Sequence, residues 1–139
     1  MKIAYVDSAV WIAQCEGKEA YQQIVDEKIA SLENDEWMLA FSDLVFLEVL
    51  LKPHRQERLD LIEVYDNAFA QALWLPASES VFRDAFDIAH ADNLKTVDAI
   101  HIAIAVKHKC ELFVTTDPDF RNLQSLPLQW IDLSQALPK

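Results

Sequence analysis

IAYVDS, residues 3–8, is the stretch from which the fold and the site of this chain can be worked out. Its first four residues are apolar and predict a buried strand at about 2–6, and a short helix is expected from about Ser8. Asp7 lies between the two, where a carboxylate removed from water costs free energy unless it is paired or bound to a metal. The stretch therefore predicts a strand that ends on a chemically unusual acid and leads into a helix.

The alternation of strand and helix continues along the chain. Further strands are predicted at about 37–41, 73–75, 112–115 and 128–131. Helices are predicted at about 18–33, from Ser42 or Asp43 to Leu51, at about 55–72, from Ser78 or Ser80 to 91, and at 97–108, with a turn or short helix at 118–122. This order predicts an α/β fold with a mainly parallel central sheet flanked by helices. In such sheets functional groups lie at the carboxyl ends of the strands.

Length and composition describe the class of protein. The 139 residues fit a single domain over residues 1–139, and 52% hydrophobic with 25% charged residues is typical of a globular chain. No apolar run approaches the roughly 18 residues of a membrane span, and the amino terminus lacks a basic stretch followed by an apolar core. We therefore expect a cytoplasmic protein without membrane association. Cys15 and Cys110 are isolated and are expected to be free thiols.

The net charge of -11 at pH 7 argues against a broad basic surface that grips nucleic acid through its phosphates alone. A nucleic-acid function would have to overcome the repulsion locally. Either a cation bound at an acidic site or a basic partner subunit could do so.

Four acids lie at the edge or in the middle of apolar segments, without an obvious cationic neighbour: Asp7, Glu48, Asp98 and Asp117. Asp7 and Asp117 each follow a predicted strand, so both are expected at the same edge of the sheet. Carboxylate oxygens are the ligands that hard divalent cations prefer. The pattern therefore predicts one shared acidic site that holds such a cation.

Three of these acids also have ordinary structural interpretations. Asp7 could cap the helix that follows it, Asp98 could stabilise the first turn of its own helix, and Asp117 could be a turn residue. Glu48 is harder to explain in this way, because helical spacing places it on one face with Leu44, Leu47 and Leu51. We therefore predict that Glu48 lies on or beside a buried stripe.

Other conspicuous side chains are expected to be part of the core. His101 follows Asp98 by three residues in an apolar helix and is interpreted as a hydrogen-bonded core histidine more readily than as a ligand. Trp37, Trp74 and Trp130 lie beside apolar strand segments and are expected to be buried. Trp11 is expected in the core or in a dimer contact.

Four segments resemble, in order, the successive motifs of PIN domains, most closely the VapC-type toxins of bacterial and archaeal toxin–antitoxin pairs. These segments are YVDS at 5–8, Glu48 in a helix after FSD at 41–43, TVDAIHIA at 96–103, and TTDPDF at 115–120. The resemblance implies a three-layer PIN-like fold and a metal-dependent endoribonuclease. It places Mg²⁺ or Mn²⁺ at the four acids named above.

The resemblance also implies accessory residues and partners. Ser8 and Thr115 match positions whose hydroxyls could orient the carboxylates or a scissile phosphate, and Asp119 matches an accessory acid. Ala9 departs from the family pattern, which often has a second small polar residue there. The implied partners are an RNA substrate, an antitoxin whose Arg or Lys enters the acidic pocket, and a second copy of the chain.

The implied chemistry is hydrolysis of an RNA phosphodiester bond by a water that the metal activates, leaving 5′-phosphate and 3′-hydroxyl ends. Two rival functions fit poorly. A phosphatase that uses Asp7 as nucleophile would need a second acid two residues later, where Ala9 stands, and a receiver domain would need a lysine near the last strand. A non-catalytic RNA-binding or regulatory protein that retains the acidic pocket is the alternative that the sequence leaves open.

Overall fold

The computed structural model describes residues 1–136 and has one sheet with the strand order β3-β2-β1-β4-β5. All four strand pairs are parallel. The strands are β1 (Lys2–Val6), β2 (Trp37–Ser42), β3 (Leu73–Leu75), β4 (Leu112–Thr115) and β5 (Leu128–Trp130). The predicted parallel sheet is thereby confirmed.

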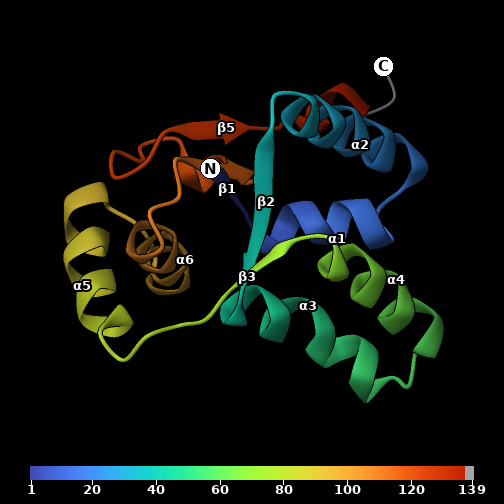
Figure 1. The fold of residues 1–139 in the computed structure, drawn as a ribbon, viewed down its shortest axis with the longest axis horizontal. Coiled ribbons are helices and arrows are strands. Elements are labelled where there is room, and N and C mark those ends of the chain that lie inside the picture. Colours follow the sequence, from blue (N-terminus) through green and yellow to red (C-terminus); the bar gives the residue numbers. More distant parts are fainter. Residues whose placement is uncertain (137–139) are drawn as a thin grey trace.

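Helices cover both faces of this sheet, which gives the three layers that the PIN-like fold requires. In Figure 1 the pair α5 and α6 lies on one side of the sheet, and α1, α2 and α4 lie on the other. The helices are α1 (Ser8–Glu16), α2 (Glu19–Asn34), α3 (Asp43–Arg55), α4 (Leu59–Ala70), α5 (Val81–Asp92) and α6 (Thr96–Lys107), with short 3-10 helices η1 (Pro118–Phe120) and η2 (Leu133–Ala136). Within residues 1–136 no helix has the length and apolar character that crossing a membrane requires.

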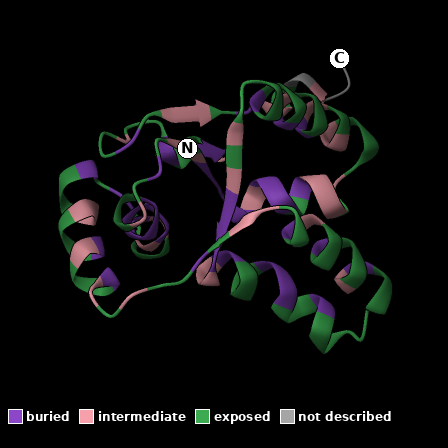
Figure 2. Ribbon diagram, viewed as in Figure 1, coloured by how far each residue is buried: buried purple, intermediate pink, exposed green. Residues whose placement is uncertain are grey.

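The core lies where the central strands meet the helices, as the buried residues in Figure 2 show. Tyr5 on β1 is fully buried and stacks on Phe113 of β4 with 5.3 Å between the ring centroids. On the other side of the sheet, Phe41 of β2 stacks on Phe69 of α4 at 4.1 Å. Each of these rings removes a large apolar surface from water and so contributes strongly to stability.

The tryptophan predictions hold for the centre of the fold and fail at its edges. Trp11 is buried, with 2% of its surface exposed, and Trp37 is partly buried. The expectation of buried positions for Trp74 and Trp130 is wrong, because their exposed fractions are 59% and 45%. The reason is topological: both lie on the outermost strands, β3 and β5, which have a neighbouring strand on one side only.

The buried face of α3 also differs from the prediction. Val45, Val49 and Leu50 face the core, whereas Leu47 is 56% exposed and Leu51 is 43% exposed. Glu48 is consequently not on a buried stripe. It lies beside the core at a partly exposed position, and its contacts, described below, explain why an acid stands there.

The boundary between α3 and α4 lies at a left-handed residue and not at the proline. The helix continues through Pro53 to Arg55, although the sequence predicted that it would end at Leu51. Pro53 lacks the N–H that would bond to the Val49 carbonyl, and only two residues of the helix follow it, so one bond is lost close to the helix end. Glu57 then adopts a φ of 53°, which interrupts the helix predicted from 55 and moves the start of α4 to Leu59.

Candidate acidic site

The carboxyl ends of β1 and β4 are adjacent and bring the first acid into place. Asp7 directly follows β1, and its backbone N–H donates to the Val114 carbonyl of β4 at 2.9 Å. Its Oδ1 accepts the Ser8 N–H at 2.8 Å, which is also the cap of α1, and its Oδ2 accepts the Thr115 hydroxyl at 2.8 Å. The carboxyl is therefore fixed by three elements of the fold.

Burial of Asp7 has an electrostatic consequence. Only 6% of the residue is exposed, and this burial raises the pKa of its carboxyl, against the opposing effects of His101, Thr115 and Ser8. A group held in this way is costly as an anion and gains from a cation nearby.

Thr115 joins the two strand ends. Its side chain is fully buried, donates to Asp7 and accepts the backbone N–H of Asp117 at 3.0 Å. This position explains why a hydroxyl stands at the end of an otherwise apolar strand. The single hydroxyl orients the Asp7 carboxylate and fixes the start of the turn that carries Asp117.

Glu48 is held by side chains from two other elements. Its Oε1 accepts the Ser8 hydroxyl at 2.8 Å and contacts His101 Nε2 at 2.5 Å. His101 Nε2 also lies 3.6 Å from Asp7 Oδ1, so one imidazole joins both acids. Partial burial opposes ionisation of Glu48, but the hydrogen bond and the attraction from His101 outweigh it and lower the pKa of the carboxyl.

A buried chain of hydrogen bonds extends from the Nδ1 atom of His101, on the side of the ring away from Glu48. Its Nδ1 lies 2.6 Å from the Tyr5 hydroxyl, which lies 2.6 Å from Ser42 Oγ, and Ser42 Oγ accepts the Val45 N–H as the cap of α3. An ionised carboxylate only accepts, so His101 Nε2 donates to Glu48. The imidazole is thus fixed in orientation by the core.

The remaining acids form a compact group. One carboxylate oxygen from each of Asp98, Asp117 and Asp119 lies within 4.8 Å of the other two. Asp117 Oδ1 accepts the Asp119 N–H at 2.9 Å, and Asp119 Oδ2 accepts Lys95 Nζ at 2.9 Å. Burial, followed by the charges of Asp117 and Asp7, raises the pKa of Asp98 to about 6. The acids on η1, on α6 and after β1 therefore share one electrostatic environment.

The donor set suits a hard divalent cation. The residues that converge are carboxylates and hydroxyls, without a thiolate, and oxygen ligands of this kind favour Mg²⁺ or Mn²⁺. Burial and the nearby charges of Asp117 and Asp7 both disfavour the ionised form of Asp98, and a cation bound beside it would offset both effects. We call the five acids together the acidic edge: Asp7, Glu48, Asp98, Asp117 and Asp119.

All seven residues singled out from the sequence lie at or beside the acidic edge, but in two groups. Asp7 and Glu48 are linked through Ser8 and His101, whereas Asp98 and Asp117 group with Asp119. Asp119, expected to be accessory, lies in the tighter group. Their catalytic and metal-binding roles stay predictions.

Sequence reasoning missed the contribution of His101 and Tyr5 to the site. His101 is buried and hydrogen-bonded, as expected of a core histidine, yet its partner is a site acid. The available signal was a single imidazole in an apolar helix three residues after Asp98. The Tyr5 hydroxyl carried no signal of its own, because an apolar strand accommodates tyrosine readily.

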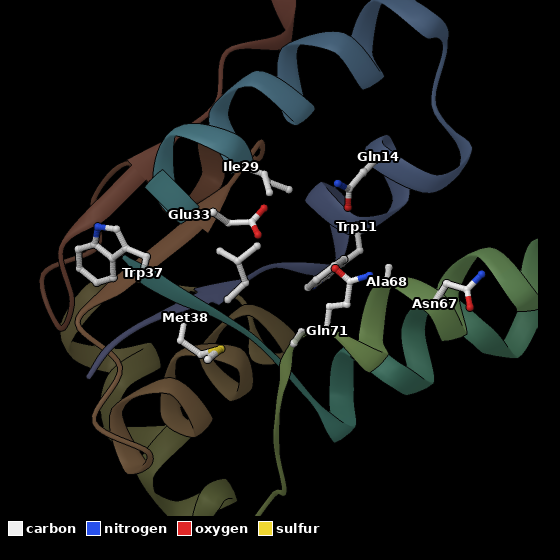
Figure 3. Close-up of a pocket in the computed structure, with 11 residues that line it drawn as sticks. Trp11, Gln14, Ile29, Glu33, Trp37, Met38, Asn67, Ala68 and Gln71 are labelled. Atoms are coloured by element: carbon white, nitrogen blue, oxygen red, sulfur yellow. The ribbon is translucent and has the colours of Figure 1, made fainter. Parts of the chain in front are cut away.

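The acidic edge is separate from a larger hollow in the molecule. A pocket of about 410 Å³ lies between α1, α2, β2 and α4. Figure 3 shows Trp11, Gln14, Trp37 and Gln71 around it. None of the candidate site residues lines this pocket.

Comparison with known proteins agrees with this architecture. A family model described as the PIN domain matches residues 4–126. Among solved structures, the chain is similar to VapBC2 from Rickettsia felis, a structure that also contains a DNA fragment from the VapBC2 promoter. The TM-score is 0.75 at 12% identity, and the similarity covers 94% of this chain and 99% of that chain. It is also similar to a toxin–antitoxin complex from Klebsiella pneumoniae, with a TM-score of 0.66, 19% identity, and coverage of 88% and 94%.

Two further similarities complete the comparison. VapC20 of Mycobacterium tuberculosis, described as a Sarcin-Ricin loop cleaving toxin, gives a TM-score of 0.60 at 16% identity, with coverage of 79% of this chain and 86% of that chain. A curated sequence, the tRNA (guanine-N(7)-)-methyltransferase non-catalytic subunit wuho of Drosophila mojavensis, is 30% identical over 118 residues. The match covers 84% of this chain but only 29% of that protein's length. At these identities the structural similarities establish the fold.

Proposed function

This chain belongs to the PIN domain family, and we propose that it is a Mg²⁺- or Mn²⁺-dependent endoribonuclease. The observation that carries the proposal is the group of three carboxylates within 4.8 Å beside the buried Asp7. Three or four like charges at one edge are unfavourable in isolation, and a divalent cation is the ligand that makes them favourable.

The residues of the acidic edge would have different roles in holding a divalent cation. A bound divalent cation supplies stabilisation of developing charge on a phosphate and makes water a stronger acid. Asp7 is held by Ser8 and Thr115, and Glu48 by Ser8 and His101, so these two carboxylates offer ligands in fixed positions. Asp98 and Asp117 would complete the oxygen ligands. Hydrolysis of this kind leaves 5′-phosphate and 3′-hydroxyl ends.

Incubation of the metal-loaded protein with total RNA, followed by mapping of the cut ends, tests the proposal. Asp7→Asn and Glu48→Gln, and EDTA added to the parent, should each remove most of the cleavage, whereas Asp119→Asn should be milder. Asp66→Asn, exposed on α4, is the matched control for the change in charge. Full cleavage by the Asp7 variant would refute the mechanism, and RNA binding without cleavage by the parent would favour the non-catalytic alternative.

We further propose that the protein is the toxin of a toxin–antitoxin pair. Two of the similar structures are described as VapBC2 and as a toxin–antitoxin complex, which supports a partner of this class. An acidic edge on a chain with a net charge of -11 is complementary to an Arg or Lys side chain from such a partner. Co-purification with the product of a neighbouring gene, together with loss of RNA cleavage, would support the role. Overexpression without any effect on growth or translation would contradict it.

Two finer proposals concern assembly and location. Phe82 and Phe86, one turn apart on α5, are 70% and 76% exposed, and this supports a homodimer in which they are covered. Sedimentation of the parent and of Phe86→Ser should show a dimer only for the parent. We also propose a cytoplasmic location, where the RNA substrate is found, and fractionation of cells tests it.

A further inference from the structure

A small pocket of about 190 Å³ includes two acids of the tighter group. It is lined by Asn93, Lys95, Asp98, Asp119, Arg121 and Asn122. One wall is the connection between α5 and α6, and the other is the segment after η1. The pocket therefore adjoins the acidic edge and opens next to the place where the proposed chemistry occurs.

The two walls are tied together by a buried carboxylate that has no part in the chemistry. Asp92 is 4% exposed, and its Oδ2 accepts the N–H groups of Gln124 and Ser125 at 3.3 and 3.1 Å and the Ser125 hydroxyl at 2.7 Å. Asn93 follows with a φ of 52°, which turns the chain away from α5 and into the pocket wall. Fixed hydrogen bonds thus maintain the shape of this pocket.

The charges in the pocket are unusual for this protein. The chain has 12 Lys and Arg residues against 23 acids, yet two of the cations, Lys95 and Arg121, line a single small pocket. Lys95 is paired with Asp119 and its side chain is 80% exposed, so the pair is weak and readily exchanged. Arg121 makes no ion pair within the described part of the chain. The pocket lining also contains two carboxylates, so its formal charges balance. When a divalent cation offsets these carboxylates, the two cations and two amides are suited to an anion with several oxygens.

We propose that this pocket binds a backbone phosphate of the RNA strand next to the one that is cleaved, with Lys95 and Arg121 as its ligands. The substrate class rests on the proposed nuclease function. Lys95 would exchange Asp119 for the phosphate, which frees the Asp119 carboxylate for the acidic edge. Since Asp98 and Asp119 repel an anion, the phosphate should bind more tightly when a divalent cation neutralises them.

The pocket should affect affinity and leave base preference unchanged, because contacts to phosphates position a strand without reading its sequence. Lys95→Met and Arg121→Met, made in an Asp7→Asn background that prevents cleavage, test this. The matched control is Lys107→Met, which removes the same charge from the other end of α6, about 18 Å away at 1.5 Å per residue. The probe is a labelled single-stranded RNA of mixed sequence, with Mg²⁺ present and the salt concentration varied.

We expect Lys95→Met and Arg121→Met to weaken RNA binding about three- to tenfold each and to reduce the slope of log K against log salt by about 0.7 each. Lys107→Met should change neither quantity. Equal effects of all three variants would overturn the proposal, because they would reflect net charge alone. Weaker binding of a co-purified partner protein, with RNA binding unchanged, would also overturn it.

The outcome separates this proposal from the nuclease proposal. If the parent cleaves RNA and the two pocket variants bind it as the control does, the pocket assignment fails and the nuclease stands. If the parent never cleaves RNA but the pocket variants bind it more weakly than the control, the pocket stands and the nuclease fails. Absence of RNA binding by every form contradicts both.

Discussion

Asp98→Asn should stabilise the protein in the absence of metal at neutral pH. Asp98 lies in the first turn of α6, and one oxygen of its carboxylate is within 4.8 Å of oxygens from two other acids. Burial and the charges of Asp117 and Asp7 raise its pKa from 3.8 to about 6. Replacement by the neutral amide removes this unfavourable ionisation with little change in shape.

The size of the effect follows from these values. A pKa raised from 3.8 to about 6 corresponds to about 3 kcal/mol at most. Two unit charges 4.8 Å apart repel by about 3.5 kcal/mol at an effective dielectric of 20 and by about 0.9 kcal/mol in bulk water. Since Asp98 is partly exposed, solvent screening reduces the gain to about 1–1.5 kcal/mol.

An opposing effect comes from the helix. An acid in the first turn interacts favourably with the helix dipole by about 0.3–1 kcal/mol, and the amide loses this interaction. The net gain of Asp98→Asn is then between about 0 and 1.2 kcal/mol, which raises Tm by up to about 4 °C for a chain of this length.

The sign depends on pH in a defined way. Below pH 3.8 the carboxyl holds its proton in both states, so parent and variant should differ little. Between pH 3.8 and about 6 the unfolded chain loses the proton first, so the folded parent loses stability progressively relative to the variant. Above about pH 6 the difference should be constant.

Thermal melts in EDTA at pH 4, 5, 6 and 7.5 measure this dependence. Mn²⁺ at 100 times its Kd should then stabilise the parent by about 2.7 kcal/mol and the Asp98 variant by less. Asp66→Asn on α4 controls for the net charge. A variant clearly less stable than the metal-free parent at pH 7.5, with a parent that does not respond to Mn²⁺, would show that Asp98 acts only as a helix-capping acid.

Three other predictions concern the surroundings of the site and the core. His101→Gln should retain more Mn²⁺ affinity in calorimetry than His101→Asn, because the glutamine amide can reach Glu48 as Nε2 does, whereas the asparagine amide lies nearer Tyr5. Equal losses of affinity would show that the ring only fills space. Ser42→Ala removes the cap of α3 and a partner of the buried Tyr5 hydroxyl. Urea unfolding should therefore show a free energy of unfolding lower by about 1–2 kcal/mol, and an unchanged midpoint would contradict the assigned hydrogen bonds. Phe69→Ala removes a ring stacked on Phe41 and should lower the free energy of unfolding by about 3–5 kcal/mol in the same assay. A decrease below about 1 kcal/mol would mean that α4 does not pack as described.

The sequence was sufficient for the centre of the fold because the central strands are covered on both faces. Apolar runs at 2–6, 37–41 and 112–115 correspond to β1, β2 and β4, the three strands in the middle of the sheet. Apolar character alone does not distinguish a central from an outermost strand. Trp74 and Trp130 were therefore expected to be buried, and the pairing order that exposes them is a property of the whole topology.

The candidate site was predictable where an acid ends or begins an apolar run, as for Asp7, Asp98 and Asp117. For Glu48 the sequence correctly indicated a position beside the other acids, but the helical spacing used to argue it was misleading. The prediction placed it on or beside a buried stripe of Leu44, Leu47 and Leu51, but Leu47 and Leu51 are exposed. Its actual position depends on Ser8 and His101, 40 and 53 residues away in sequence, and helical periodicity does not contain such contacts.

The acidic edge contains two carboxylates that protein hydrogen bonds hold in place and one, Asp98, that they do not. This difference determines which carboxylates would contribute most to binding a cation. Both oxygens of Asp7 accept hydrogen bonds, and Oε1 of Glu48 accepts two. Within residues 1–136 the Asp98 carboxylate accepts none, and its pKa is raised to about 6. A cation would therefore gain most from Asp98, whose carboxylate has the least compensation from protein hydrogen bonds. The fixed pair would set the geometry, since Ser8, Thr115 and His101 hold those oxygens whether or not a cation is bound.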